Sequence, residues 1–574
     1  MTDTPSKVNE DEKESKQPLP SDAIFVIATN DHQQPLDKAT KSVQEGAIES
    51  TVQDVIQHGH SLENGDSQIV DKPKDFFGSR HVFAFMGFLG LASVYMMRIN
   101  LSVAIVDMVR TPSGDNATSF FGRSGGTSAS NSTEQCEYEE DSGSSESNGE
   151  FDWDGETQGL ILGAFFWGYM VTQIPGGILA EKYGGKYVLG LGILLTDFFS
   201  VLTPLAARQG GANAVIVMRV LTGLAEGVSF PAANSMVSKW VPTFERTTIG
   251  AFVLAGTQFG TVIIMPLSGW LCSLEFDNGW PLAFYVPGII GVIWFTLWVF
   301  LVFDSPSVHP RIAEDEKRYI LASTGIKKPI PMSETPWKTI LTSIHLWAIL
   351  VAHLGHSWGL SMLLTELPTY MKTVLHFDLK ANGALSALPY LAMWLFSIAF
   401  SVTADAIRKN KILNTTYTRK VFTTIGLLLP ACGLIGVSYT GCDRVATITL
   451  LTVSCGFNGA IYSGFLANHI DIASNFAGTM MGVTNCVASI CGFLAPYIVN
   501  LIVTESGSLD QWQTVFFLSA GIYAATNLFY VVFSTGVEQP WNKINRDPIL
   551  EQRRNESISS MTSSSSSDQS SKSK

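Results

Sequence analysis

Three ionisable residues stand inside segments that are otherwise apolar. Arg98 lies in the run YMMRINLSVAIVDMV, and Arg219 and Glu226 lie in MRVLTGLAEGVSFPAAN. Arg219 and Glu226 are seven residues apart, about two helical turns, so both side chains are expected on nearly the same helix face. A charge at the centre of a lone membrane helix costs roughly 2.5–3.5 kcal/mol, so this face is predicted to line a polar pathway.

Two arginines and one carboxylate in such a pathway predict an anion site with a titratable gate. A guanidinium group stays charged and offers a planar pair of donors that matches carboxylate or phosphate. We therefore predict that Arg98 and Arg219 bind an anion and that Glu226 couples its binding to a cation. In this hypothesis ionised Glu226 competes with the anion for Arg219, and protonated Glu226 releases it. The alternatives are a structural ion pair and snorkelling side chains.

Other polar residues within apolar runs are weaker candidates. His353 and His356 are three residues apart in VAHLGHSWGL, and His356 is predicted to contact the anion or to respond to pH. Asp197 is either a cation ligand or a residue at a misjudged helix end. Tyr169 and Asn458 are predicted to face the substrate, although helix-packing hydrogen bonds are the alternative role for both. No spacing indicates a metal site.

The composition indicates a protein that spans the lipid bilayer many times. The chain has 574 residues, of which 46% are hydrophobic and 15% charged, whereas charged residues make up about 25% of a typical soluble protein. The net charge of −13 argues against a nucleic-acid partner. No P-loop motif is present, so neither enzyme chemistry nor ATP-driven transport is predicted, and no cofactor is expected beyond a coupling ion, Na⁺ or H⁺.

Twelve apolar runs of membrane-spanning length predict an all-α polytopic protein built from two six-helix halves. A two-half arrangement places a substrate site near the bilayer midplane between the halves. The predicted organisation is a disordered cytosolic tail (1–78), a first half (79–303) with a long luminal or extracellular loop (110–156), a cytosolic linker (304–342), a second half (343–535) and a disordered cytosolic tail (536–574).

Two cues predict the orientation of the chain. Lys and Arg are concentrated in the linker and in the turn near residues 408–420, which places both, and both termini, in the cytosol. The sequons at Asn116 and Asn131 lie in the long first loop, on the opposite side of the membrane, where glycosylation takes place.

A short turn motif supports the transporter interpretation. The segment GILAEKYGGK matches the G-x-L-A-D-R-x-G-R-K turn of the major facilitator superfamily, with Glu181 at the acidic position. Glu181 with Lys182 or Lys186 is predicted to form a conformational latch. Asp405 and Arg408 lie in a degenerate copy of the motif at the corresponding position of the second half.

Longer segments resemble one branch of that superfamily, the anion:cation symporter family. They are RINLSVAIVDMV, FDWDGETQGLILGAFFWGYMVTQIPGGILAEKYGGK, RVLTGLAEGVSFPAANSMVSKWVPTFER, LPTYMK and NHIDIASNFAGTMMGVTN. This family holds sialin, the vesicular glutamate transporters and the type I sodium-phosphate cotransporters. The chain looks most similar to insect members described as inorganic phosphate cotransporters. The resemblance implies that Arg98 and Arg219 recognise the substrate and that Glu226 takes part in coupling.

Three positions depart from the patterns of the better-known members. Thr222 stands where sialin-like sequences have a second acid, Leu162 where vesicular glutamate transporters have a histidine, and His356 where they have an arginine. We therefore expect a symporter of a small anion, with phosphate favoured and sialic acid or acidic amino acids as alternatives. A non-transporting anion receptor and an anion channel are the alternatives from other classes.

The resemblance does not decide which cellular membrane contains the protein. Members of the family occur in the plasma membrane and in lysosomal or vesicular membranes. We expect a monomer to be sufficient for function.

Overall fold

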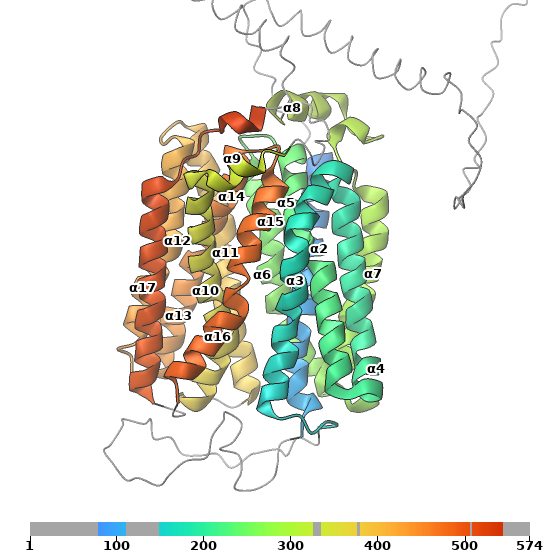
Figure 1. The fold of residues 1–574 in the computed structure, drawn as a ribbon, viewed down its shortest axis with the longest axis vertical. Helices are drawn as coiled ribbons and strands as arrows, with labels where there is room; N and C mark the ends of the chain where they lie inside the picture. Colours follow the sequence, from blue (N-terminus) through green and yellow to red (C-terminus); the bar gives the residue numbers. More distant parts are fainter. Residues whose placement is uncertain (1–77, 111–148, 325–334, 376–378, 505–507, 544–574) are drawn as a thin grey trace, which may run out of the picture. The chain divides into compact units, whose positions relative to one another are not determined.

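The computed structural model describes residues 78–110, 149–324, 335–375, 379–504 and 508–543. These segments are helical apart from turns and one isolated bridge between Val109 and Phe151. The helices form two bundles that lie side by side, one from each half of the sequence (Figure 1). The end of the bundles that carries α8 (Glu314–Thr324) is called the linker end below, and the opposite end the loop end.

The first half consists of long apolar helices. They are α2 (Ser79–Met108), α3 (Gly155–Tyr183), α4 (Gly185–Glu226), α5 (Ser229–Trp240), α6 (Arg246–Cys272) and α7 (Leu282–Leu301). The stretch from α4 through α5 has 56 residues, roughly 84 Å of helix, which is far more than one hydrocarbon core of ~30 Å. It turns back at Gly211, whose φ of 59° and ψ of −153° interrupt α4. Residues 185–240 therefore make two passes.

The second half repeats this plan with more broken helices. It contains α10 (Ile344–Thr373), α11 (Leu379–Lys409), α12 (Thr415–Val437), α13 (Arg444–Asn458), η5 (Gly459–Tyr462), α14 (Phe465–Ile472), α15 (Ala477–Ala488), α16 (Cys491–Ile502) and α17 (Leu509–Phe533). The elements from α13 to α14 form one pass, and α15 with α16 forms another.

The number of passes agrees with the sequence prediction. Ten helical segments in the described part are long and apolar enough to cross a membrane. One of the ten is the double pass 185–240, and the 29-residue helix α3, which contains Gln158, Gln173 and Glu181, lies outside the ten. Twelve passes result, so the predicted twelve-helix, two-half fold is confirmed.

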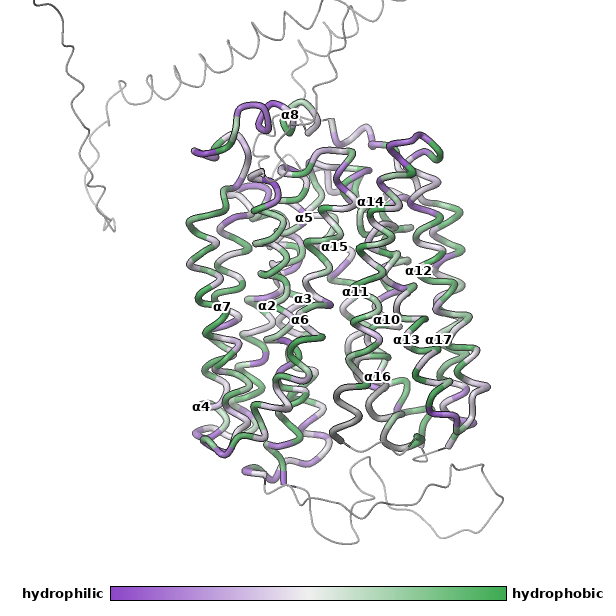
Figure 2. Tube along the Cα trace, turned by 180° about the vertical axis from the view of Figure 1, so that it is seen from behind, coloured by the Kyte–Doolittle hydropathy of each residue, from purple (hydrophilic) through white to green (hydrophobic). Residues whose placement is uncertain are grey.

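The outer surface of the helices is apolar, as a lipid environment requires. On α7 the side chains of Ile289, Ile293 and Phe300 are 57–67% exposed, while Trp294 and Trp298 on the opposite face are buried. Figure 2 shows hydrophobic residues along the length of the helices and hydrophilic residues concentrated at their ends. Such large exposed apolar surfaces mark a membrane interface.

The described part of the predicted linker contains η3 (Pro306–Val308), α8 and α9 (Trp337–Thr342), and α8 packs on the first half. Arg80 at the start of α2 forms ion pairs with Glu316 of α8 at 3.1 Å and with Glu245 at 3.0 Å. The backbone N–H of Ser79 donates to the same Glu316 carboxylate at 2.8 Å. A buried arginine with two acids fixes the linker end of α2.

One predicted tail boundary is wrong. The disordered C-terminal tail was expected from residue 536, but a short helix, η6 (Pro540–Lys543), packs against the second half. The ring of Trp541 is buried with its centroid 6.0 Å from that of Phe476, and Asn542 accepts two hydrogen bonds from Asn475. Burial of the Trp541 ring stabilises the packing of η6 on the second half. The tails 1–77 and 544–574 lie outside the described residues, as does loop segment 111–148 with Asn116 and Asn131.

Candidate functional site

The centre of the first half contains a buried ion pair between Arg98 on α2 and Glu226 at the end of α4. Arg98 Nε donates to Glu226 Oε1 at 2.7 Å, and Arg98 Nη2 contacts the same oxygen. The Glu226 side chain is 1% exposed and that of Arg98 is 13% exposed. The second carboxylate oxygen of Glu226 accepts no hydrogen bond from any described residue.

Three aromatic rings surround the Arg98 guanidinium. Its central carbon lies 4.4 Å from the ring centroid of Tyr169, 4.7 Å from that of Tyr95 and 4.8 Å from that of Phe165. The faces of aromatic rings attract cations, and this attraction is stronger where water is excluded. The rings therefore hold the guanidinium at the level of Glu226, and Arg98 Nη1 also donates to the Tyr95 hydroxyl at 3.5 Å.

Arg219 lies against one of these same rings. Its guanidinium carbon is 5.0 Å from the ring centroid of Phe165, so Phe165 contacts both arginines. Arg219 is 6% exposed, and its Nε has no hydrogen-bond partner among the described residues. It forms no ion pair within 4.0 Å in the described part of the chain. A buried guanidinium with unused donors is suited to bind an anion.

We predicted that ionised Glu226 pairs with Arg219 and so competes with the anion for it. This choice of arginine is wrong. The structure pairs Glu226 with Arg98. Seven residues along one helix correspond to a rise of about 10.5 Å, too far for direct contact between two side chains that point the same way. Arg98 comes from a neighbouring helix at the height of Glu226, and only the packing of α2 on α4 sets that height.

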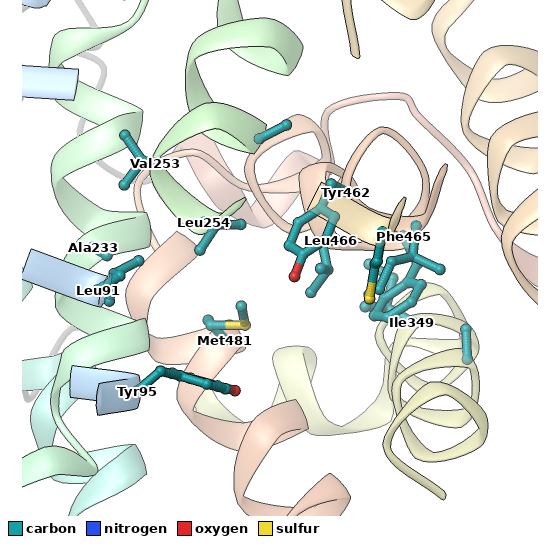
Figure 3. Packing of buried hydrophobic residues seen from close by; sticks show 14 of the residues in the cluster. Leu91, Tyr95, Ala233, Val253, Leu254, Ile349, Tyr462, Phe465, Leu466 and Met481 are labelled. Atoms are coloured by element: carbon teal, nitrogen blue, oxygen red, sulfur yellow. The ribbon is translucent and has the colours of Figure 1, made fainter. Parts of the chain in front are cut away.

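Tyr169 also connects the two halves. Its hydroxyl accepts a hydrogen bond from Asn485 Nδ2 of α15 at 3.0 Å. Figure 3 shows Tyr95 from α2 and Tyr462 from η5 extending toward the zone between the halves, beside Met481 of α15. Tyr462 accepts a hydrogen bond from Gln258 of α6 at 2.7 Å. The arginine pair therefore lies next to the contact between the halves.

The two substrate-binding residues predicted in the second half, Asn458 and His356, lie apart from the arginine pair. Asn458 Nδ2 donates to the Gly426 carbonyl of α12 at 2.7 Å, the helix-packing role that the sequence left as an alternative. His356 is buried with its ring 6.0 Å from Phe465, and its Nδ1 has no hydrogen-bond partner among the described residues. Neither residue contacts Arg98 or Arg219 in the described contacts.

A chain of hydrogen bonds joins two further histidines. His469 Nδ1 lies 3.0 Å from the Leu466 carbonyl, which only accepts, so Nδ1 carries the proton. In the neutral ring Nε2 then accepts from the Thr484 hydroxyl at 2.8 Å, and the Thr484 oxygen accepts from His353 Nδ1 at 3.2 Å. Thr484 directly precedes Asn485, so α15 links this chain to the Tyr169 contact.

The predicted latch residues lie where the halves meet at the linker end. The Glu181 carboxylate accepts from the backbone N–H and the hydroxyl of Thr479 on α15, at 2.8 and 2.7 Å. In the corresponding pair of helices Asp405 of α11 accepts from the Thr248 N–H of α6 at 2.6 Å. Both motif copies therefore bind the opposite half.

The predicted basic partners have separate roles. Arg408 contacts its neighbour Asp405 at 3.4 Å and the Thr247 hydroxyl of the opposite half at 3.2 Å. Lys186 donates to the Val299 carbonyl at 2.8 Å, and Lys182 lies over the Tyr183 ring. These lysine contacts stay within the first half.

Sequence reasoning missed one cluster at the linker end. Asp471 pairs with Arg419 at 2.6 Å and lies 3.9 Å from Arg246 of the opposite half, and Arg419 also donates to Thr247 at 3.1 Å. Asp471 stands in the segment NHIDIASNF, but its role needs partners from α12 and α6, which are far away in the sequence.

A family model described as the Major Facilitator Superfamily matches residues 87–496. The chain belongs to this superfamily. A solved superfamily structure, the proton:xylose symporter XylE bound to a bromodeoxyglucose, aligns with a TM-score of 0.58 over 80% of this chain and 98% of its own. Their identity is 13%, so that likeness concerns the fold alone.

Sequence relatives place the chain within one group of the superfamily. A Drosophila melanogaster protein named "Putative inorganic phosphate cotransporter" is 44% identical over 85% of this chain and 92% of its own length. Sialin from Ovis aries is 42% identical over 81% and 90%, and vesicular glutamate transporter 1 from Xenopus tropicalis is 37% identical over 80% and 76%. The expected group is confirmed, and these superfamily relatives are transporters rather than enzymes.

Proposed function

We propose that this chain is a secondary active symporter that moves a small anion together with protons or sodium ions by alternating access. The observation that carries the proposal is the placement of two buried arginines against the same ring, Phe165, with one acid, Glu226, paired to Arg98 alone. Phosphate is the favoured anion, because a relative with 44% identity is named as a phosphate cotransporter.

The geometry supports a specific coupling step. Ionised Glu226 occupies the donors of Arg98, whereas protonated Glu226 leaves Arg98 charged and without its counter-ion. An anion that reaches Arg219 then binds both guanidinium groups with good charge balance. Anion binding and protonation of Glu226 favour each other, which is the thermodynamic requirement for symport. A sodium ion bound to Glu226 would release Arg98 in the same way.

The cross-half contacts support alternating access. Glu181, Asp405 and Asp471 all bind or approach residues of the opposite half at the linker end. These contacts close the linker end in the present conformation and have to break when the site opens to that side. The superfamily fold is known for rocking of one half against the other around a central site.

The proposed orientation places the linker end and both termini in the cytosol. Cys442, in the turn between α12 and α13 at the loop end, takes part in a disulfide bond. Disulfides persist on the extracellular or luminal side of a membrane, which supports the assignment from the Lys and Arg distribution.

Uptake into proteoliposomes tests this proposal. Purified protein is offered radiolabelled phosphate with proton and sodium gradients imposed separately, with Arg219→Ala and Glu226→Gln as variants and Arg219→Lys as the matched control. We expect uptake driven by one gradient, at least a tenfold loss in Arg219→Ala, and exchange without accumulation in Glu226→Gln. Sialic acid and glutamate are offered to the same vesicles, because sialin is almost as similar to this chain as the phosphate relative.

Each outcome separates two candidate functions. Accumulation of an organic anion but not of phosphate would replace the substrate and keep the mechanism. A current that reverses at the equilibrium potential of the anion would indicate a channel. Binding of the anion without any uptake would indicate a receptor.

A further inference from the structure

A second buried acid in the first half has no role in the proposed anion site. Asp197 lies on α4 and its side chain is fully buried at 0% exposure. Neither of its carboxylate oxygens accepts a hydrogen bond from any described residue. An ionised carboxylate in an apolar interior without donors is very costly, so such a group is held neutral or binds a cation.

The surroundings of Asp197 come from three helices. On α7, Gly291 leaves the room that the carboxylate fills, because a Cβ on Gly291 would come within 2.6 Å of Asp197 Oδ1 and nearer still to Oδ2. On α2, Ser93 is 1% exposed and lies near the carboxylate, but its hydroxyl also has no partner with the geometry of a hydrogen bond. The two polar groups, neither with a hydrogen-bond partner among the described residues, therefore lie together in one buried layer.

A neighbouring polar layer among the same helices shows what a purely structural contact looks like here. Asn100 of α2 donates to the Ser200 hydroxyl of α4 at 3.4 Å and to the Ala283 carbonyl of α7 at 3.2 Å. Asn100 is an uncharged amide with its donors satisfied. Asp197 instead places a titratable carboxylate between these helices, and no described residue donates a hydrogen bond that would stabilise its negative charge.

The charged groups near this layer are few. Helix α7, over Leu282–Leu301, contains no Asp, Glu, Lys, Arg or His, and its one titratable side chain is that of Tyr285. Helix α2 contributes Arg98, which is paired with Glu226, and α4 contributes Arg219 and Glu226 itself. Of these, Glu226 interacts electrostatically with Asp197. No cation in the described contacts compensates a negative charge on Asp197.

A proton fits this site better than a metal ion. Hard cations take about six or more oxygen ligands, whereas the described contacts of the Asp197 carboxylate offer one further oxygen, the Ser93 hydroxyl. No group of three or more metal-binding side chains occurs in the described residues. A proton needs a single oxygen and turns the carboxylate into a neutral group that suits an apolar layer.

We propose that Asp197 is a second proton-binding site of the transporter, distinct from Glu226, that holds its proton in this conformation and releases it when α2 moves. Helix α2 carries both Ser93 and Arg98, so a shift of α2 that accompanies anion binding at Arg98 also changes the packing around Asp197. Release leaves an aspartate carboxylate and one free proton. The part of this inference that concerns transport depends on the proposed symport, whereas the protonation of Asp197 does not.

Infrared spectroscopy of the full chain in lipid nanodiscs tests the protonation directly. A protonated carboxylic acid has a C=O stretch separate from the carboxylate bands, and carbon-13 in the side-chain carboxyl of aspartate shifts it. We expect a band at neutral pH that shifts with labelled aspartate, disappears in Asp197→Asn and remains in Glu226→Gln. Because labelling needs only wild-type protein, a folding defect in Asp197→Asn does not prevent the test.

Transport assays test the release of the proton. Asp197→Asn mimics the protonated state, so we expect anion exchange at the wild-type rate and at least a tenfold loss of accumulation driven by a pH gradient. Ser93→Ala, which leaves the acid in place, is expected to keep accumulation. If neither a pH gradient nor a sodium gradient drives anion transport by wild type, the proposed function fails while the infrared result still decides the protonation of Asp197. If only a sodium gradient drives transport, the proposed function stands and the release of a proton from Asp197 during transport is refuted.

Three results would overturn the proposal. One is a wild-type spectrum without an aspartic acid band. Another is an acid band together with unchanged accumulation in Asp197→Asn, which would make the proton a permanent structural one. The third is thermal stabilisation by sodium that Asp197→Asn abolishes, which would make the site a sodium site.

Discussion

Glu226 pairs with Arg98 of a neighbouring helix rather than with Arg219, which precedes it by two turns on its own helix. The acid therefore neutralises one arginine of the candidate anion site and leaves the other without a counter-ion. This asymmetry gives the two arginines different expected phenotypes when each is replaced.

The first prediction concerns stability. Arg98→Ala leaves Glu226 buried without its partner, which typically costs about 3–5 kcal/mol. Arg219→Ala strands no acid, so its cost is expected to be smaller. Adding Glu226→Gln to Arg98→Ala is expected to recover most of the thermal stability without restoring uptake. Thermal unfolding in detergent and uptake assays measure the two effects, and additive losses in the double variant would contradict the pairing.

The second prediction concerns the linker-end latch. Glu181→Ala removes the acceptor for two hydrogen bonds from Thr479, and bonds to charged groups contribute about 1.5–3 kcal/mol each. We expect the halves to separate more often at this end. Spin labels at the exposed positions Tyr183 and Ile412, on opposite halves, should show a larger population of long distances.

The latch experiment has a matched control. Glu314→Gln changes an exposed acid that pairs with Lys317 within the linker. It should leave the distance distribution unchanged. The same shift in both variants would mean that loss of negative charge at this end, not the Thr479 contact, opens the halves.

The third prediction concerns the histidine chain. Thr484→Val keeps the side-chain shape but removes the hydroxyl between His353 and His469, so both rings lose a partner. Two lost hydrogen bonds correspond to about 2 kcal/mol of unfolding free energy. Nitrogen-15 spectra of labelled histidine should show the fixed Nδ1–H tautomer of His469 in wild type. A Thr484→Val protein as stable as wild type would show that the chain contributes nothing.

The fourth prediction concerns pH dependence at the loop end. Burial raises the pKa of Glu150, but hydrogen bonds from Arg208 and Trp280 outweigh it, and the net pKa lies below its ordinary value of 4.5. The carboxylate therefore stabilises the fold fully above about pH 4.5, and this contribution is lost as the pH falls through the lowered pKa. Glu150 is exposed to solvent, which screens its ion pair, so the contribution is about 0.2–1 kcal/mol.

Thermal unfolding at several pH values measures this contribution. The stability difference between wild type and Glu150→Gln should be present at pH 7 and should shrink below pH 4.5. Glu156→Gln, which removes an exposed acid from the first turn of α3, serves as the control for the loss of one carboxylate at this end. A difference that stays constant down to the lowest pH would contradict the role of the charge.

The fold prediction, which depends on local sequence, was confirmed, whereas contacts between distant residues could not be predicted. The twelve passes and their two-half arrangement follow from runs of apolar residues, because crossing a bilayer depends on local composition and length. The turn at Gly211 and the motif around Glu181 are local as well. The contact of Glu181 with Thr479, by contrast, joins residues that are almost 300 positions apart.

The sequence by itself determined which residues are chemically out of place: Arg98, Arg219, Glu226 and Asp197 are ionisable groups in apolar helices, and their cost in lipid depends on residue type and span alone. Only the tertiary structure decided their partners. Helix height and rotation in the bundle paired Glu226 with Arg98, brought both arginines against Phe165, and left Asp197 against Gly291 with no hydrogen bond from a described residue. Those relations depend on packing between helices that are distant in sequence, and helix periodicity carries no information about them.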